Sequence, residues 1–576
     1  MNTVTITLNG RTATVPAGVS ILEAAKRNGI FLPSLCHHPD QKVKANCRVC
    51  VVEVEGMKGL VPSCSTTVAE GMKITTNSTK VRETVRTIVE LILADHPQDC
   101  LTCVRGGDCE LRRLTEKLGI SHIEGERSRG GNNQLPRHEP HCSIVRNPNK
   151  CIKCGRCAEV CHHTQEVGVL YSHNRGIDIC VTPEFGKKLS EVGCVFCGQC
   201  AAVCPVGAIH ERNDTEQVWQ ALADSQKHVV VQVAPSIHVS IAEEFGYQPG
   251  EIASPRLVSA LRALGFDRVF DANFAADLTI MEEGSELLQR IDTGDRLPMI
   301  TSCCPGWINY IERYYPQHLG HLSSCKSPHQ MLGAVAKTYY AQRCGIPPED
   351  VFVVSIMPCV AKKYEADRPE MRNSGFRDVD VVLTTRELGK MLRSEGIDFS
   401  SLEDGKFDSI LGESTGAGAI FGATGGVMEA ALRTVYELVT KKPLPALEFY
   451  ETRGLEGIKE AAVSLDEKQV KVAVAHGLSN AKKILRRIEA GEADYAFVEV
   501  MGCPGGCVGG GGQPYGTTND IRKKRAEAIY QKDAGMPVRK SHENREVAEL
   551  YKAFLGVPLG EMSHRLLHTT YSAKTY

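Results

Sequence analysis

Hydrophobic and polar residues alternate over the first fifteen positions of the chain, which read MNTVTITLNGRTATV. A period of two predicts two antiparallel strands, and Asn9-Gly10 predicts the turn between them. A helix is predicted next, with Ser20 as its N-cap, Glu23 closing a capping box and Gly29 ending it. We expect no secretory signal, because this segment lacks a continuous apolar core.

From about residue 228, hydrophobic runs of strand length alternate with longer amphipathic segments. The runs are VVVQVAP, PMITS, VFVVSIMP, VDVVLTT, VKVAVAHG and YAFVEVMG. This alternation predicts β/α units with mostly parallel sheets. Residues 124–141 are polar, contain Gly and Pro and have no hydrophobic period, which predicts a linker. No run approaches the roughly 18 apolar residues of a membrane span, so we expect no contact with a membrane.

Composition narrows the class of protein. A chain of 576 residues suggests about four domains. Lys and Arg total 67 and Asp and Glu total 69, a net charge of -2, so no overall field favours nucleic acid. The 24 cysteines are the unusual feature. In the reducing cytoplasm, where we expect this protein, so many cysteines indicate metal ligands rather than disulfides.

One cysteine motif occurs twice, with the spacing C-x2-C-x2-C-x3-C that iron–sulfur clusters require. The fourth cysteine of each run binds the other cluster in two-cluster ferredoxins. One [4Fe–4S] centre is therefore assigned to Cys151, Cys154, Cys157 and Cys204, and the other to Cys194, Cys197, Cys200 and Cys161. A pair of zinc sites is the alternative, but its spacing differs. His162 replaces the proline that usually follows such a run, whereas Pro205 keeps it.

Two further groups of possible ligands precede this repeat. The first consists of Cys36, Cys47, Cys50 and Cys64. It resembles a plant-type [2Fe–2S] ferredoxin domain with a longer first interval, as in modules of respiratory complex I, and zinc is the alternative. The second consists of His96, Cys100, Cys103 and Cys109. Its spacing alone fits a zinc site or a His-ligated [4Fe–4S] cluster, and its position between iron–sulfur modules favours the cluster.

Four clusters in series predict an electron conduit with a catalytic end in the remaining residues. Three later cysteine motifs directly follow predicted strands: Cys303 with Cys304, Cys359, and Cys503 with Cys507. Because ligands in open α/β sheets bind beyond the carboxyl ends of strands, we expect these cysteines to converge on one site. Cys142, Cys180, Cys325 and Cys344 have no motif around them and are interpreted as structural.

The three late motifs read TSCCPGW from Thr301, MPCVAKKYE from Met357 and EVMGCPGGCVGGGGQP from Glu499. Together they resemble the signature of [FeFe]-hydrogenases, and the order of upstream motifs is similar to the long monomeric, ferredoxin-linked clostridial type. The resemblance implies an α+β multidomain protein: a [2Fe–2S] ferredoxin-like (β-grasp) domain at 1–80, a His/Cys3 [4Fe–4S] domain at 81–125, a bacterial 2[4Fe–4S] ferredoxin-like domain at 138–212 and a large two-lobed α/β catalytic domain at 213–576.

The resemblance also implies an H-cluster, in which a [4Fe–4S] cubane is joined to a di-iron subsite carrying CO, cyanide and an azadithiolate bridge. Its cubane ligands match Cys304, Cys359, Cys503 and Cys507, and Cys507 also bridges to the di-iron subsite. Residues matching the surroundings of that subsite are Lys362, Pro235, Ser236, Met357, Pro358 and Met501. Lysine offers three hydrogen-bond donors to cyanide, and methionine fills irregular space.

A proton path is implied as well. Cys303 matches the thiol that passes protons to the bridge, whereas the simpler interpretation is a small buried side chain. Residues matching the rest of the relay are Glu283, Ser323, Glu286 and Arg290. The spacing of the two glutamates and the arginine places them on one helix face, which equally fits a solvated surface helix with an ordinary ion pair. His329 stands where several relatives have glutamine, so no cavity role is predicted for it.

The resemblance therefore implies reversible formation of H2 from protons and electrons, with ferredoxin as electron partner. The expected cofactors are the H-cluster, one [2Fe–2S] and three accessory [4Fe–4S] clusters, and separate maturation proteins install the di-iron subsite. We expect a monomer. Three alternatives are a complex I-type electron-transfer subunit, a hydrogenase-like iron–sulfur scaffold and an H2 sensor. Gly509 to Gly512 fit no phosphate-loop or nicotinamide motif and are expected to permit close backbone approach to the cluster.

Overall fold

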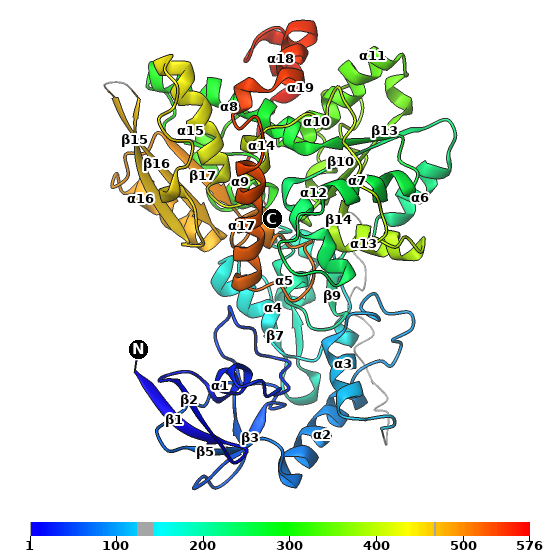
Figure 1. The fold of residues 1–576 in the computed structure, drawn as a ribbon, viewed down its shortest axis with the longest axis vertical. Coiled ribbons are helices and arrows are strands. Elements are labelled where there is room, and N and C mark those ends of the chain that lie inside the picture. The colour runs from blue at the N-terminus through cyan, green and yellow to red at the C-terminus, as the bar shows by residue number, and fades with distance from the viewer. Residues whose placement is uncertain (1, 124–141, 466–467, 576) are drawn as a thin grey trace.

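The computed structural model describes residues 2–123, 142–465 and 468–575. Figure 1 shows residues 2–123 at one end of an elongated molecule, the cysteine repeat in the middle and two larger sheets at the other end. The linker predicted at 124–141 lies outside the described residues. Within the described ranges, no helix is long and apolar enough to cross a membrane.

The N-terminal hairpin is confirmed. β1 (Thr3–Leu8) and β2 (Arg11–Pro16) pair antiparallel across the Asn9-Gly10 turn. Both turn residues have positive φ, 51° and 79°, as a tight hairpin turn requires. β3 (Val51–Val54), β4 (Val61–Pro62) and β5 (Lys73–Thr75) complete a sheet in the order β2-β1-β5-β3-β4.

The first helix, α1 (Ile21–Arg27), begins and ends as predicted. The Ser20 hydroxyl accepts the Glu23 backbone N–H at 3.2 Å, and Gly29 with φ 71° follows the last turn. The predicted capping box also requires the Glu23 carboxylate to accept the Ser20 backbone N–H. The carboxylate instead forms an ion pair with Arg27 at 2.8 Å. α2 (Thr79–Ala94) and α3 (Glu110–Lys117) then flank the segment that carries His96 and its three cysteines.

The cysteine repeat folds as two matching half-units between the antiparallel strands β6 (Ile144–Arg146) and β9 (Ile209–Glu211). Each half has a glycine with positive φ directly before a short helix: Gly155 before α4 (Arg156–Glu159) and Gly198 before α5 (Gln199–Ala202). A π-helical turn η3 (Val160–Thr164) continues α4, and β7 (Tyr171–His173) and β8 (Cys180–Thr182) form a second hairpin. The duplication seen in the sequence is therefore a duplication of backbone conformation.

Two sheets build the C-terminal part, and all six predicted strand runs contain observed strands. The first sheet is parallel in the order β11-β10-β13-β14, and the second has the order β12-β17-β16-β15 with β15 antiparallel. Their bounds are β10 (His228–Val233), β11 (Arg268–Asp271), β12 (Met299–Ile300), β13 (Val351–Met357), β14 (Val381–Thr384), β15 (Ile458–Leu465), β16 (Lys468–His476) and β17 (Phe497–Met501). The sequence patterns did not predict β11 or β15.

Helices cover both sheets and pack between them (Figure 1). Those of the first half are α6 (Thr215–Ala223), α7 (Ser254–Ala263), α8 (Ala272–Thr293), α9 (Pro305–Tyr314), α10 (Pro328–Val335), α11 (Ala341–Cys344), α12 (Ala361–Ala366) and α13 (Thr385–Ser394). Those of the second half are α14 (Gly416–Ile420), α15 (Gly426–Thr440), α16 (Leu478–Glu489), α17 (Asn519–Ala534), α18 (Arg545–Leu550) and α19 (Glu561–Leu567). α8 is the longest described helix, and fourteen of its residues are buried, so it is an internal helix between the two sheets.

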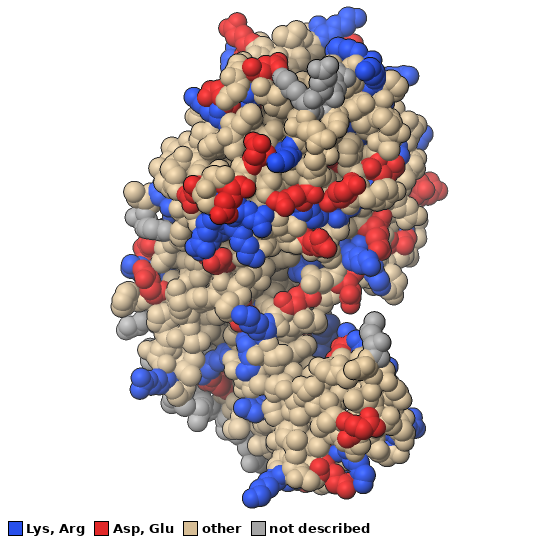
Figure 2. Space-filling model, turned by 90° about the vertical axis from the view of Figure 1, so that its left-hand side faces the viewer, with Lys and Arg blue, Asp and Glu red and all other residues tan. Residues whose placement is uncertain are grey.

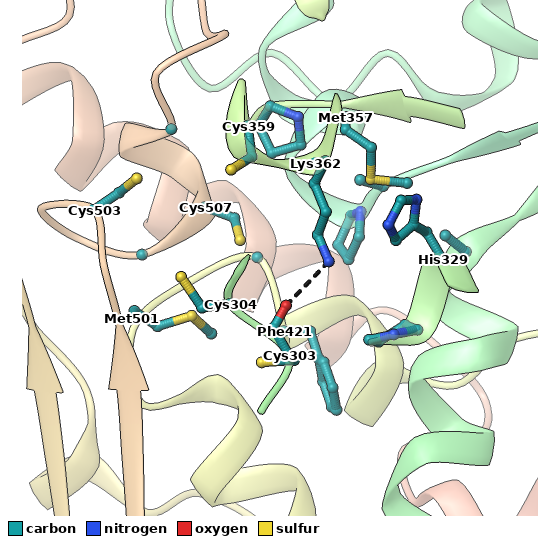
Figure 3. Close-up of a pocket in the computed structure, with 18 of the residues that line it drawn as sticks. Cys303, Cys304, His329, Met357, Cys359, Lys362, Phe421, Met501, Cys503 and Cys507 are labelled. Carbon is teal, nitrogen blue, oxygen red and sulfur yellow. Dashed lines mark hydrogen bonds between the residues drawn. The ribbon is translucent and has the colours of Figure 1, made fainter. Parts of the chain in front are cut away.

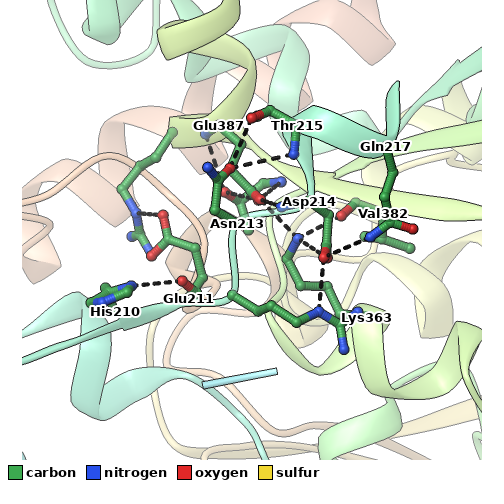
Figure 4. Close-up of polar contacts among 12 residues, drawn as sticks. His210, Glu211, Asn213, Asp214, Thr215, Gln217, Lys363, Val382 and Glu387 are labelled. Atoms are coloured by element: carbon green, nitrogen blue, oxygen red, sulfur yellow. Dashed lines mark hydrogen bonds and ion pairs between the residues drawn. The ribbon is translucent and has the colours of Figure 1, made fainter. Parts of the chain in front are cut away.

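Buried ion pairs fasten the end of the cysteine repeat to the C-terminal part (Figure 4). Arg386 binds Glu211 at 2.7 Å and 3.1 Å, and the Lys363 ammonium lies 2.7 Å from Asp214 and 2.9 Å from Glu387. All five side chains are buried. Removing one partner of such a pair leaves an uncompensated buried charge, so these contacts fix the two parts relative to each other.

One face of the molecule carries no dominant charge (Figure 2). Figure 2 shows Lys and Arg beside Asp and Glu over one face, without a continuous area of one sign. This agrees with the net charge of -2.

Candidate functional site

The three late cysteine motifs converge on one cavity, as the strand positions predict (Figure 3). Cys303 and Cys304 follow β12, Cys359 follows β13, and Cys503 and Cys507 follow β17. β12 and β17 are neighbours in one sheet, whereas β13 belongs to the other. The cavity, with about 750 Å³ of empty space, therefore lies where the carboxyl ends of the two sheets face each other.

Apolar side chains line most of this cavity. Of the six residues expected around a di-iron subsite, all but Ser236 line it: Pro235, Met357, Pro358, Lys362 and Met501. Phe421 and Pro328 complete the apolar wall. An apolar wall excludes water and strengthens the few polar interactions that remain.

The thiols of the cavity are held close together in a dry environment. Burial and neighbouring cysteines raise the pKa of Cys359 and Cys507 to about 12 and that of Cys503 well above its ordinary value. Such thiols remain protonated unless a cation replaces the proton. A buried set of four or more convergent thiols thus fits an iron–sulfur cluster, whose iron ions compensate the thiolate charge.

The adjacent cysteines of the first motif face different surroundings. Cys304 packs with the group around Trp307 and accepts the Gly502 N–H at 3.2 Å, whereas Cys303 packs with the group around Phe421 and Met501. A backbone N–H aimed at sulfur is typical support for a cluster ligand. The Cys303 thiol is also raised in pKa, first by burial and then by Glu283.

The Lys362 ammonium occupies one end of a short polar chain. It donates to the Cys303 carbonyl at 3.0 Å and to Glu365 at 2.8 Å (Figure 3 shows the first of these bonds). Glu365 also contacts His329 Nε2 at 2.6 Å. Burial opposes the charge on Glu365, but Lys362 and His329 hold its pKa at about 2. Lys362 is thereby kept as a positioned cation at the cavity wall.

His329 lines the cavity as well, although the sequence assigned it no role. Burial, followed by the charge of Lys362, lowers the pKa of His329 to about 4, so its imidazole is neutral at neutral pH. Its Nδ1 lies 3.3 Å from the Ser355 hydroxyl. His329 therefore helps to fix the lysine–glutamate pair rather than adding charge to the cavity.

Ser236, beside the cavity-lining Pro235, is fully buried, and its hydroxyl has no hydrogen-bond partner among the described residues. A buried hydroxyl without a partner is costly unless a ligand accepts its hydrogen bond. The position therefore fits a polar ligand of the bound group.

The predicted relay residues are brought together. The Ser323 hydroxyl donates to Glu286 at 3.2 Å, and Arg290 donates to Glu286 at 2.6 Å. Glu283 is 2% exposed and has one carboxylate oxygen without a partner among the described residues. Burial raises its pKa to about 8. The alternative of a solvated surface helix is wrong, because Glu283 and Glu286 are both buried on α8. Among the three α8 residues of the relay, only Arg290, at its end, is partly exposed.

Four cysteines of the repeat line a second, smaller cavity. As predicted, three come from the first motif and the fourth from the second: Cys151, Cys154, Cys157 and Cys204. Cys194 and Cys197 lie near Cys200, and Cys200 lies near Cys161, since the charges of these neighbouring thiols raise the pKa of Cys194, Cys197 and Cys200 further after burial has raised it. Cys161 lies in the π-helical turn, where His162 contacts the Leu170 carbonyl at 2.9 Å.

The N-terminal thiols form two hydrogen-bonded pairs. A bond from Cys47 lowers the pKa of Cys36 to about 5, and a bond from Cys64 lowers that of Cys50 to about 6. The two pairs lie near each other, since the charges of Cys36 and Cys47 also act on Cys64. Four thiols within one loop-rich region fit a small cluster better than four unrelated buried side chains.

The fourth group follows α2. His96 comes immediately after its C-cap Asp95, and Cys109 is the N-cap of α3. Cys100 is exposed, whereas Cys103 lies close to Gly207, where a Cβ would come within 2.8 Å of its sulfur. The group thus extends from the surface to the cysteine repeat.

Loop contacts link these sites in space. Gln41 donates to the Arg156 carbonyl at 3.1 Å, so the loop between Cys36 and Cys47 touches the loop of Cys154 and Cys157. Arg105 donates to the Cys204 carbonyl at 2.7 Å and joins the His96 group to the same cavity. The N-terminal thiols and the His96 group are therefore joined separately to the loops of the same cavity.

The other half of the repeat touches the large cavity. Gln199 donates to the Gly509 carbonyl at 2.9 Å, and a Cβ at Gly511 would lie 2.5 Å from the Cys197 carbonyl. A Cβ at Gly510 would clash with the Pro358 carbonyl, and a Cβ at Gly512 would lie 2.7 Å from the Thr384 side chain. These glycines therefore permit close packing of neighbouring backbone segments, whereas their expected close approach to a cluster stays a prediction.

Sequence reasoning missed some residues of the site. Glu365 lies one helical turn after Lys362, and this spacing was the available signal. Phe421 and Pro328 come from segments without any motif, so only the fold places them in the cavity. Of the cysteines interpreted as structural, Cys142, Cys180 and Cys325 are buried, whereas Cys344 is exposed and is not explained by packing.

Family comparisons cover nearly the whole chain. The C-terminal domain of the iron only hydrogenase large subunit matches residues 227–511, and the iron hydrogenase small subunit matches 519–574. Upstream, a 2Fe-2S iron-sulfur cluster binding domain matches 1–79, the NADH-ubiquinone oxidoreductase-G iron-sulfur binding region matches 86–124, and a 4Fe-4S dicluster domain matches 150–208.

Individual relatives agree with these matches. The NADP-reducing hydrogenase subunit HndD of Solidesulfovibrio fructosivorans is 49% identical over 99% of each chain, and iron hydrogenase 1 of Clostridium pasteurianum is 41% identical over 98% of this chain and 99% of its own. A solved apo [FeFe]-hydrogenase from Chlamydomonas reinhardtii is 47% identical, with a TM-score of 0.56, and covers 62% of this chain and 98% of its own.

These relatives share both the iron–sulfur modules and the domain that forms the large cavity. An electron-transfer subunit alone would not account for the match over 227–511. With full-length identities of 41% and 49% to named hydrogenases, the chain belongs to the iron-only, or [FeFe], hydrogenase family and is a hydrogenase.

Proposed function

We propose that this hydrogenase catalyses reversible H2 formation at an H-cluster in the large cavity, with ferredoxin as its electron partner. Convergence of five cysteines from three distant strand ends carries the proposal. When bound, the H-cluster supplies the iron site at which protons and electrons combine to H2.

The chain's own residues would hold this group in distinct ways. Cys304, Cys359, Cys503 and Cys507 would provide thiolates to the cubane, and Cys507 would also reach the di-iron subsite. Lys362 would donate to a cyanide, supported by its fixed position between the Cys303 carbonyl and Glu365. The Ser236 hydroxyl would donate to the other cyanide, which its lack of a partner among the described residues supports. Pro235, Met357, Pro358 and Met501 would shape a dry pocket.

Protons would move along Cys303, Glu283, Ser323, Glu286 and Arg290. In the direction of H2 formation, Glu286 would receive a proton near the surface and pass it through the Ser323 hydroxyl to Glu283. Glu283 suits this position, because a pKa of about 8 allows it to bind and release a proton near neutral pH. Its free carboxylate oxygen can then face the Cys303 thiol, which delivers the proton to the bound group.

Electrons would enter at either of two accessory centres. Cys36, Cys47, Cys50 and Cys64 would hold a [2Fe–2S] cluster, and His96, Cys100, Cys103 and Cys109 a [4Fe–4S] cluster. Both would deliver electrons to the cubane of Cys151, Cys154, Cys157 and Cys204, which the Gln41 and Arg105 contacts support. The cubane of Cys194, Cys197, Cys200 and Cys161 would pass them on, since its loop touches Gly509 and Gly511.

The proposed domain boundaries follow these units: 1–80 with a β-grasp sheet, 81–125, 138–212 and 213–576 with two lobes, one for each large sheet. The chain would act in the cytoplasm as a monomer, after separate maturation proteins have installed the di-iron subsite. One solved relative is described as revealing stepwise H-cluster assembly, which supports such a requirement.

One observation favours NADPH as an alternative electron partner. The relative with 49% identity is named a subunit of an NADP-reducing hydrogenase. A similar role here would require another chain, because this sequence has no recognisable nicotinamide motif. Purified matured protein with reduced ferredoxin or with NADPH separates the two: H2 from ferredoxin alone supports our proposal, and H2 that requires NADPH and a second, co-purified chain contradicts it.

The catalytic proposal is tested with anaerobically matured protein whose iron is quantified. H2 evolution from reduced viologen should collapse in Cys303→Ala while iron content stays constant. Cys344→Ala is the matched control, since this cysteine is exposed and outside the site. An absence of H2 from fully iron-loaded, matured wild type would overturn the proposal.

A further inference from the structure

A second chain of polar groups reaches Glu286 through Ser324, outside the lining of the cavity. The Ser324 hydroxyl lies 3.0 Å from Glu286 Oε2 and 2.8 Å from His568 Nδ1. His568 Nε2 lies 3.1 Å from Glu282 Oε2. His568 is 5% exposed and Glu282 is fully buried. Glu286, Ser324, His568 and Glu282 thus form one continuous path that shares only Glu286 with the relay from Cys303 to Arg290.

The backbone holds His568 at this position. Lys326 N donates to the Leu567 carbonyl and Thr569 N donates to the Ser324 carbonyl, both at 2.8 Å. The C-terminal segment after α19 is therefore paired with the segment that carries the relay serine. α19 packs against α10 (Figure 1), and its Ser563 hydroxyl donates to Glu282 of α8.

Glu282 is suited to orient and stabilise the imidazole. Burial opposes its charge, but hydrogen bonds from His568, Ser563, Tyr551 and the Leu559 N–H lower its pKa below the ordinary value. It remains a carboxylate, so it accepts from Nε2 and leaves Nδ1 facing Ser324. A carboxylate that holds one ring nitrogen in this way fixes the orientation of the ring and leaves the other nitrogen facing its hydroxyl partner.

We propose that His568 is a second proton acceptor of the relay, reached from Glu286 through Ser324. The transfer balances without any redox partner. The O–H bond of protonated Glu286 breaks, its proton passes to the Ser324 oxygen, and the Ser324 hydroxyl proton passes to His568 Nδ1. The products are the Glu286 carboxylate and the His568 imidazolium, stabilised by Glu282.

The branch can hold one of the two protons that H2 oxidation releases. Oxidation of one H2 releases two protons, whereas the relay joins the cavity to the surface through single groups. With His568 available, Glu286 can pass on the first proton and accept the second before either reaches solution. The inference rests on the proposed relay and deepens it. Groups facing His568 besides these carboxylates are Cys325, whose thiol is buried, and the exposed His564, whose ring centroid is 4.4 Å away.

Two assays on the matured holoenzyme test the branch. D2 oxidation with a viologen acceptor releases two deuterons for each turnover, whereas exchange of D2 with water to HD exports one deuteron and imports one proton. Both H568Q and S324A should slow D2 oxidation at least threefold relative to HD exchange. S324T should restore the ratio, because it retains the hydroxyl. H564Q is the matched control and should leave the ratio unchanged.

The outcomes separate the possible explanations. If H568Q and S324A leave the ratio of oxidation to exchange at the wild-type value, the branch is wrong, whether both rates fall equally through a structural effect or neither falls. A ratio that also changes in H564Q contradicts the assignment to His568. If iron-loaded wild type shows neither oxidation nor exchange, the proposed function itself fails, independently of these variants.

Discussion

The iron–sulfur region and the catalytic cavity use the same side chain but assemble it differently. In the cysteine repeat, three proposed ligands of each centre come from one loop of seven residues, and a glycine with positive φ shapes each loop. In the cavity, the thiols come from three strand ends in two sheets. The local sites depend on loop geometry, whereas the cavity depends on the whole C-terminal fold.

The strongest test of this difference removes one thiol from each region. Cys507→Ala should abolish the iron of the cavity and lower H2 evolution by more than about a hundredfold, beyond the usual loss for a supporting residue. Cys154→Ala should remove only the signals of its own centre. Iron analysis and electron paramagnetic resonance of the reduced proteins check both expectations. Equal loss of all clusters in the two variants would contradict the separation of the regions.

The second test concerns the proton path beside the cavity. Glu283→Gln should lower H2 evolution by about 100- to 10,000-fold, the ordinary range for a group that transfers protons. In the wild type, the pKa of about 8 predicts that the rate falls as pH rises through this value, because Glu283 loses its proton. A rate–pH profile measured with Glu283→Asp as control should keep a weaker form of this decline.

The same raised pKa predicts a sign for stability. The native state retains the Glu283 proton at pH values where the unfolded chain has lost it. The protonated Glu283 therefore contributes to the free energy of unfolding at pH values below the ordinary glutamate pKa. This contribution is lost as pH rises toward about 8. Thermal unfolding of Glu283→Gln should depend less on pH over this range, and an unchanged dependence would contradict the burial of the carboxyl.

The sequence was sufficient for the local sites and for part of the cavity. Spacing alone assigned Cys151, Cys154, Cys157 and Cys204 to one centre, and the structure places these four around one cavity. The strand-end positions of Cys359 and Cys503 predicted their convergence. Phe421, by contrast, reaches the cavity from a segment without periodic or motif signal, and only the packing of two sheets brings it there.

A third test addresses the polar chain that sequence spacing left unnoticed. Glu365→Gln removes the charge that faces Lys362 and His329, and loss of one buried partner costs about 3–5 kcal/mol. We expect a lower melting temperature and a loss of activity of about 10- to 100-fold, as for groups that orient a metal site. Glu349→Gln, on the surface, is the control. Unchanged stability would contradict the arrangement around Lys362.

The smallest effect is expected at the periphery. His96→Cys adds a thiolate in place of a neutral imidazole, which should lower the reduction potential of that centre while viologen-driven H2 evolution stays close to wild type. Potentiometric titration followed by electron paramagnetic resonance measures the shift. An unchanged potential would contradict His96 as a ligand.

The adjacent pair Cys303 and Cys304 offers the most direct test of the whole account. The infrared spectrum of anaerobically matured protein reports the CO and cyanide ligands of the H-cluster separately from protein absorption. We predict that Cys303→Ala keeps these bands at wild-type intensity but loses turnover, whereas Cys304→Ala loses the bands. Bands that survive in Cys304→Ala, or vanish in Cys303→Ala, would contradict the assignment of one thiol to the metal and its neighbour to the proton.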